Sequence, residues 1–176
     1  MTHTAILADL SPARRRLAFS VLLIGSLIPS LHMFIVTIAL PSIRASLGAS
    51  ESQTSLIITG YSSAFSVCLI TGGRLADLYG RRFISIIGIV GFTIGSLCAG
   101  IAPSPIFLVI GRVTQGIFGA LMVPPVLASL RSLFRQEEIP GALSIYGTGV
   151  GVAVAGGQLL GGVLISDKAD TWIAGA

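Results

Sequence analysis

A charged side chain, Arg112, lies inside an apolar stretch over residues 105–127. Placing a charge at this depth in a bilayer costs at least about 2.5–3.5 kcal/mol, so such a residue normally faces a helix-bundle interior or a watery cavity. Gln115 follows three residues later and shares its helical face. We expect Arg112 and Gln115 to line a polar site. The alternative is that Arg112 reaches the outer interface, roughly 10 Å away along the helix axis.

A second polar residue, His32, lies within the apolar stretch 17–40. Counted along the helix, it falls at a depth similar to that of Arg112, roughly 13 Å below the outer end of its helix. A histidine titrates near neutral pH and can carry a proton. We therefore expect His32 and Arg112 to line one cavity. A neutral histidine that is hydrogen-bonded between helices is the equally weighted alternative.

The composition requires these residues to be positioned by membrane helices. Apolar residues make up 53% of the 176-residue chain and charged residues 10%, against about 25% charged in soluble domains. About 20 apolar residues cross a bilayer as a helix. The sequence therefore predicts an all-α integral membrane protein with a tail at 1–16, a polar extracellular tail at 166–176 and five spans between them. These spans cover residues 17–40, 54–75, 84–101, 105–127 and 142–165.

Lys and Arg residues orient the predicted spans. Cytoplasmic loops carry an excess of these residues. One side of the predicted topology carries seven of them and the other carries Arg44 and Lys168, so we expect a cytoplasmic N-terminus. The first set is Arg14, Arg15, Arg16, Arg81, Arg82, Arg131 and Arg135.

Glycines recur every four residues in the last predicted span, at Gly147 and Gly151 and again at Gly157 and Gly161. Small residues at this spacing allow close contact with a neighbouring helix, so we expect packing, with gating as the sharper alternative. The sequence contains no phosphate-binding loop, metal-ligand cluster or nucleophile–base pair. We therefore expect no enzyme activity, no metal and no cofactor, and the scattered basic residues do not indicate a nucleic-acid partner.

Four segments resemble the major facilitator superfamily, above all its fourteen-span drug:proton antiporter branch. The loop at 73–82 matches the superfamily's G-x-L-A-D-x-x-G-R-[KR] signature, residues 112–116 resemble the R-x-x-Q-G pattern implicated in proton coupling, and residues 35–41 resemble the branch's first-span signature. Residues 157–162 resemble the fifth-span antiporter motif. The matching loop residues are Gly73, Leu75, Asp77, Gly80, Arg81 and Arg82, and the residues of the antiporter-like motif are Gly157, Gln158, Gly161 and Gly162.

Two departures bear on what this resemblance implies. His32 stands where the first-span signature has an aspartate, and a protonated histidine would repel Arg112 instead of pairing with it. The resemblance therefore does not imply proton coupling through the usual pair, or implies it over a different pH range. Gln158 stands where the antiporter motif has proline, so the resemblance supports family membership more strongly than the direction of antiport.

The resemblance implies a multi-pass transporter of the cell inner membrane. Its expected activity is efflux of small drug-like or cationic compounds, driven by a proton gradient and contributing to multidrug resistance. A sugar or metabolite exporter is the alternative. Such transporters have two six-helix halves, so five spans predict an incomplete N-terminal half that is not competent alone and needs the C-terminal helices or another chain. From a different class, the chain could be a regulatory fragment that pairs with another transporter.

Overall fold

The computed structural model describes the backbone of residues 11–173 and the side chains of residue 11 and residues 13–163. The regular structure of this part of the chain is all helix, without a strand. Five of its segments are long and apolar enough to cross a membrane, which confirms the predicted fold class. The helices are α2 (Pro12–Leu47), α3 (Glu51–Tyr79), α4 (Arg81–Gly100), α5 (Pro105–Ala120), α6 (Val123–Leu133) and α7 (Ile139–Ile173).

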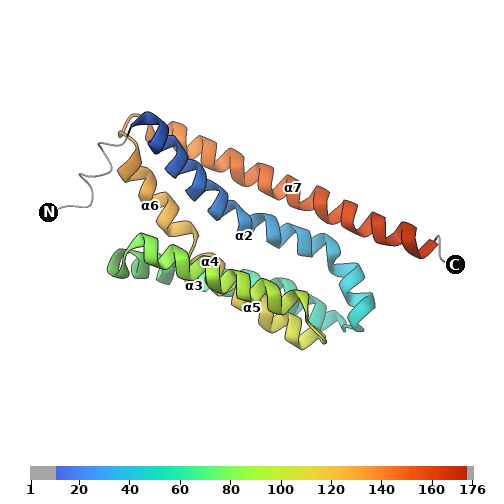
Figure 1. The fold of residues 1–176 in the computed structure, drawn as a ribbon. Helices are drawn as coiled ribbons and strands as arrows, with labels where there is room; N and C mark the ends of the chain where they lie inside the picture. Colours follow the sequence, from blue (N-terminus) through green and yellow to red (C-terminus); the bar gives the residue numbers. More distant parts are fainter. Residues whose placement is uncertain (1–10, 174–176) are drawn as a thin grey trace.

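The helices form two groups that α6 joins (Figure 1). Helices α2 and α7 lie side by side, while α3 and α4 both pack on α5. Helix α6 leaves the end of α5 and reaches the end of the molecule where α2 begins and α7 begins. The polar residues of interest lie on α2, α3, α4 and α5, where the two groups approach each other.

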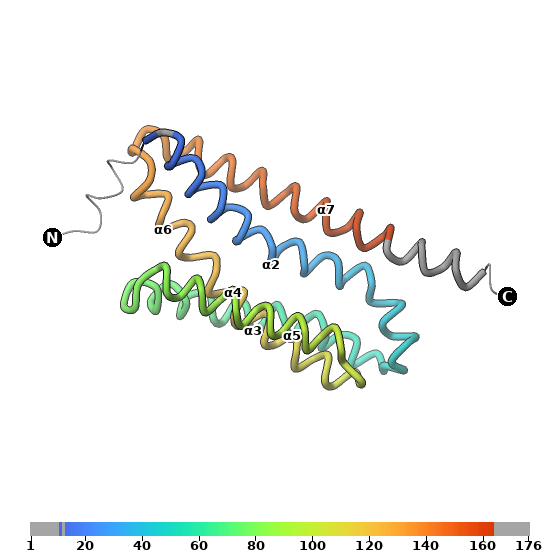
Figure 2. Tube along the Cα trace, viewed as in Figure 1, coloured from blue at the N-terminus to red at the C-terminus, as the bar shows by residue number. Residues whose placement is uncertain are grey.

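The fourth predicted span differs from one straight helix over 105–127. Its helix stops at Ala120, two turn residues follow, and α6 then continues to Leu133 (Figure 2). Pro124 and Pro125 lack the amide hydrogens that would bond to the carbonyls four residues earlier, and their rings clash with those carbonyls. Helix α3 packs closely against the end of α5 at this break. A Cβ on Gly72 would lie 3.1 Å from the Ala120 carbonyl oxygen.

Other helices also extend beyond the predicted bounds. Helix α2 continues without interruption through Pro29 and Pro41 to Leu47. The backbone of α7 remains helical to Ile173, where the sequence predicted a polar tail from residue 166. The predicted tails at 1–10 and 174–176 lie outside the described residues.

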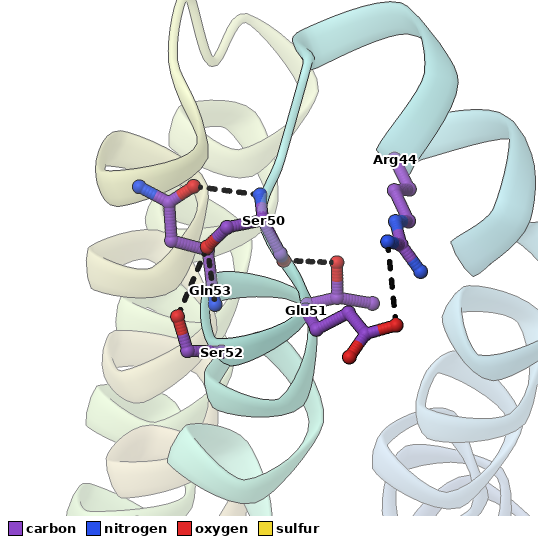
Figure 3. A network of polar contacts seen from close by, with 6 residues as sticks. Arg44, Ser50, Glu51, Ser52 and Gln53 are labelled. Atoms are coloured by element: carbon purple, nitrogen blue, oxygen red, sulfur yellow. Dashed lines mark hydrogen bonds and ion pairs between the residues drawn. The ribbon is translucent and has the colours of Figure 1, made fainter.

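A short capped connection reverses the chain between α2 and α3 (Figure 3). Gly48 adopts a left-handed φ of 61°, which favours glycine. The Ser50 hydroxyl then accepts the Gln53 amide at 3.2 Å, and the Gln53 side chain accepts the Ser50 amide at 3.0 Å. This capping box satisfies two amides at the start of α3. Arg44 and Glu51 add an exposed ion pair at 3.6 Å, which contributes little at such a site.

At the opposite end, Arg15 joins the start of α2 to the connection before α7. Its two terminal nitrogens donate to the two carboxylate oxygens of Glu138, each at 3.0 Å. Its guanidinium also lies over the Phe134 ring, with Cζ 5.1 Å from the ring centroid, and Phe134 packs edge-on against Phe19. A bidentate pair fixes geometry better than a single contact, so this contact holds α2, α6 and α7 together.

Candidate functional site

Arg112 is buried in the bundle, with 1% of its surface exposed. Its Nη1 donates to the Gln115 side-chain oxygen at 2.9 Å, and its Nε donates to the Ile57 carbonyl at 3.4 Å. The side chain therefore points between α5 and α3, and the alternative of an exposed guanidinium at the outer interface does not describe this structure. Its burial satisfies the requirement that an intramembrane charge be kept away from lipid.

Tyr61 of α3 is a member of this site that the sequence did not single out. The Arg112 guanidinium lies over its ring, with Cζ 4.2 Å from the ring centroid. The Tyr61 hydroxyl donates to the Pro29 carbonyl at 3.0 Å. One aromatic residue thus connects the buried cation on α5 to the middle of α2. Cation–π contacts are strongest where the cation has lost its water.

Gln115 extends the network to α4. Its surface is fully buried, and its Nε2 lies 2.8 Å from the Ser96 hydroxyl oxygen, to which it donates. Gly95 makes this approach possible, because a Cβ there would lie 2.9 Å from the Gln115 Cγ. Gly116 fits directly against the Tyr61 backbone carbonyl in the same way. Small residues that let helices approach closely are typical of membrane bundles.

His32 lies beside this network and forms no hydrogen bond with it among the described residues. Its ring packs edge-on against Phe92 with centroids 5.5 Å apart, and Phe92 belongs to the same buried cluster as Tyr61. The His32 Nδ1 is buried and has no hydrogen-bond partner in the part of the chain that the structure describes. The role of His32 in a proton path stays a prediction. Through Phe92, His32 contacts the cluster that contains Tyr61, whose ring contacts the Arg112 guanidinium.

Within the described part of the chain, no carboxylate forms an ion pair with Arg112. The acidic side chains in that part are Glu51 at the start of α3, Asp77 in its last turn, and Glu137 and Glu138 in the connection before α7. The site is therefore a net positive patch, balanced only by a tyrosine ring, an amide and a backbone carbonyl. Carboxylates, histidines and cysteines do not gather as a metal site there either.

The loop between α3 and α4 places the residues of the predicted loop motif at the end of the bundle. Gly80 adopts a φ of 95°, a conformation that glycine accepts without strain. Arg81 donates to the Ala128 carbonyl of α6 at 2.9 Å. Asp77 and Arg82 are exposed and border a cavity of about 1080 Å³ with Arg81. Gly73 and Leu75 pack inward instead, against Pro124 and against the cluster around Ala76.

The two glycine rows of α7 have different surroundings. A Cβ on Gly157 would lie 2.6 Å from the Leu31 carbonyl oxygen, and one on Gly161 would lie 3.2 Å from that of Ile35. This row packs directly on α2. A Cβ on Gly147 or Gly151 would meet nothing within 4 Å. Gln158 and Gly162 are exposed, so only part of the antiporter-like motif contacts another described helix.

Known proteins that resemble this chain include an antibiotic resistance protein and a probable transporter. The puromycin resistance protein of Streptomyces alboniger is 41% identical over 152 residues, and the probable actinorhodin transporter of Streptomyces coelicolor is 37% identical over 153 residues. These matches cover 86% and 87% of this chain but 30% and 26% of the relatives. The chain therefore spans less than a third of the length of these relatives.

The fold also matches a solved transporter. The bacterial homologue of the human lysosomal transporter Spinster, in its inward-facing and occupied conformation, superposes with a TM-score of 0.82 at 24% identity, covering 88% of this chain and 34% of that one. The Major Facilitator Superfamily family description matches residues 22–174. With these matches, five apolar helices and a buried arginine network, the chain belongs to the major facilitator superfamily.

Proposed function

We propose that this chain forms part of the N-terminal half of a proton-coupled exporter of small drug-like compounds. The observation that carries the proposal is the buried Arg112 network, which joins α2, α3, α4 and α5 at a depth where an unpaired charge is costly. Intramembrane ionisable residues mark substrate or proton pathways. One of the two relatives is named as an antibiotic resistance protein and the other as a transporter, which favours export over uptake.

His32 is the candidate proton carrier in this proposal. It packs against Phe92, a member of the cluster that contains Tyr61. Its Nδ1 has no hydrogen-bond partner among the described residues, and a histidine side chain can carry a proton. A proton on His32 would add a second positive charge near Arg112, so protonation would favour separation of α2 from α5. In an aspartate–arginine pair, by contrast, protonation would neutralise the carboxylate and remove an attraction.

We also propose that the N-terminus lies in the cytoplasm. The start of α2, the loop between α3 and α4 and the connection before α7 lie at the same end of the molecule (Figure 1). This end carries seven arginines, which favours the cytoplasmic side. They are Arg14, Arg15, Arg16, Arg81, Arg82, Arg131 and Arg135.

Transport is expected to require a second helical half. Alternating access in such folds moves one half against the other around a site between them. The test joins this chain to the part of the Streptomyces alboniger puromycin resistance protein that follows the matched region, and produces it in bacteria lacking their own multidrug exporters. Puromycin resistance and efflux of the cationic dye ethidium are measured for this chimera and for the chain alone.

We expect the chimera to confer resistance and to export dye, and the chain alone to do neither. A protonophore and Arg112→Ala should each abolish export, and His32→Asn should remove its pH dependence. Export that persists with a protonophore would contradict proton coupling. Unchanged pH dependence in His32→Asn would exclude that residue from the proton path. A well-folded chimera without export, combined with inhibition of a full-length relative by the chain alone, would support the regulatory-fragment alternative.

A further inference from the structure

A second cavity lies between α2 and α3, next to the Arg112 network. Its volume is about 220 Å³, and its walls come from the middle of α2 and the middle of α3. An engineered cavity of about 150 Å³ accommodates benzene, whereas drug-sized ligands occupy about 300–1,000 Å³. The cavity therefore fits one substituted ring and not a whole drug. Its lining residues include Ser30, Met33, Tyr61, Ser62, Phe65 and Ser66.

The walls suit an aromatic ring that carries a hydroxyl group. Tyr61 and Phe65 stack on each other, with centroids 5.9 Å apart and ring planes 20° apart. Both rings line the cavity, and a ligand ring can pack against them edge-to-face or in an offset stack. The hydroxyls of Ser30 and Ser66 form no hydrogen bond with other described residues, so they remain available to a ligand. A mostly apolar pocket with a few polar groups is the usual form of a small-molecule site.

Tyr61 belongs to both the cavity and the arginine network. Its hydroxyl donates a hydrogen bond to the Pro29 carbonyl, and its ring forms a cation–π contact with the Arg112 guanidinium. A ligand in the cavity therefore contacts the ring that holds the cation. Since no carboxylate offsets Arg112 among the described side chains, a cationic ligand group would be repelled there, while a neutral phenolic ring would not.

We propose that the α2–α3 cavity binds one hydroxylated aromatic ring of the exported compound, with Tyr61 as the wall that this ring shares with Arg112. The proposal rests on the export function proposed above and assigns a subsite to it. It also gives Tyr61 a role in coupling ligand binding to Arg112. A ligand ring that displaces the Tyr61 ring would change the aromatic surface that contacts the buried guanidinium.

The test measures binding without transport, using the purified 176-residue chain in a mild detergent. In a Cys68→Ser/Cys98→Ser background, Ser66→Cys places one reactive thiol in the cavity wall, and the rate of its alkylation by N-ethylmaleimide is followed. The probes are phenol, cyclohexanol and benzylammonium. At ten times its dissociation constant, a bound ligand leaves about one-eleventh of the sites open, so phenol should slow alkylation about tenfold.

A matched reporter, Ser85→Cys, lies in the large cavity at the end of the bundle. Phenol should leave its alkylation rate unchanged. Equal slowing at both reporters would show a general detergent effect and would overturn the proposal. Equal protection by cyclohexanol would show only that any apolar group, a detergent tail included, fills the space, and would also overturn it. Absence of phenol protection is a third contradiction.

Variants assign the protection to Tyr61 and to the charge. Tyr61→Phe keeps the ring and should retain phenol protection, while Tyr61→Leu should lose it. If Tyr61→Leu does not fold, Phe65→Leu removes the stacked ring without touching Arg112 and should weaken phenol protection. Benzylammonium should protect at least tenfold more weakly than phenol, and Arg112→Gln should narrow that difference. An unchanged difference in Arg112→Gln would contradict the role of the cation.

This result is separable from the transport test. Phenol protection in a chain whose chimera exports nothing would support the subsite and contradict the export function. Export by the chimera without phenol protection would support the function and overturn the subsite.

Discussion

The guanidinium of Arg112 on α5 rests on the ring of Tyr61 on α3, with Cζ 4.2 Å from the ring centroid. This pairing replaces the carboxylate that a buried cation would otherwise need. The ring's negative face attracts the cation, while the tyrosine hydroxyl holds the ring in place through the Pro29 carbonyl. Contacts among three helices, α2, α3 and α5, thus depend on one aromatic side chain.

Removing the Tyr61 ring is expected to destabilise the chain more than removing its hydroxyl. Tyr61→Phe loses a hydrogen bond that contributes about 1 kcal/mol. Tyr61→Leu also loses the cation–π contact, which contributes about 2 kcal/mol or more when desolvated. The measurement is the free energy of unfolding in mixed micelles of mild detergent and sodium dodecyl sulfate. Equal losses in the two variants would show that the ring does not stabilise Arg112.

A carboxylate at position 115 is expected to pair with Arg112, because the Gln115 oxygen already lies 2.9 Å from Nη1. We expect Gln115→Glu to be tolerated in the native background and strongly destabilising in Arg112→Leu, where the carboxylate would be buried alone. A double-mutant cycle of unfolding free energies should give a coupling of about 1–3 kcal/mol. Additive effects of the two substitutions would contradict an uncompensated positive charge at this site.

The two glycine rows of α7 are expected to respond oppositely to alanine. Gly157→Ala places a Cβ 2.6 Å from the Leu31 carbonyl oxygen, a backbone atom that cannot move without shifting α2, so it should lower the thermal midpoint. Gly151→Ala is the matched control in the same helix. Its Cβ meets nothing within 4 Å, and replacing a helical glycine should stabilise by about 0.5–1 kcal/mol. Destabilisation by both substitutions would contradict the observed packing of α7.

The contact between Arg15 and Glu138 is expected to make stability depend on pH. The Arg135 amide, and then Arg15, lower the pKa of the Glu138 carboxyl below its ordinary value. The unfolded chain therefore takes up the proton first as the pH falls. The contribution of the carboxylate is complete above the ordinary carboxyl pKa of about 4.3, and it disappears as the pH falls through the lowered folded value.

The measurement for this contact is the thermal midpoint of the native chain and of Glu138→Gln between pH 7 and pH 3. The native chain should melt higher at neutral pH, and the difference should shrink as the acid range is entered. Glu137→Gln is the control, because no ion pair involves Glu137 among the described residues. A difference that stays constant down to pH 3 would contradict the role of the carboxylate.

Features that depend on consecutive residues were predictable from the sequence. The five spans follow from runs of apolar residues, because each run must be long enough to cross the bilayer as a helix. The proximity of Arg112 and Gln115 follows from their spacing of three on one helix. The break after Ala120 was also encoded locally, in Pro124 and Pro125, but the apolar run continues through it and hydropathy alone does not register a broken helix.

Only the tertiary structure decided what surrounds the buried charge. Tyr61 is one of three tyrosines in the chain, and nothing in its neighbours along the sequence indicates that its ring meets Arg112 or that its hydroxyl reaches Pro29. The glycine spacing of α7 likewise gives two candidate packing rows, and only the position of α2 shows that Gly157 and Gly161 are the contacting pair. The physical reason is that helix-forming patterns depend on residues close together in the chain. The contact partner across a helix interface depends instead on how separate helices cross. The sequence specifies that crossing only through the fold as a whole.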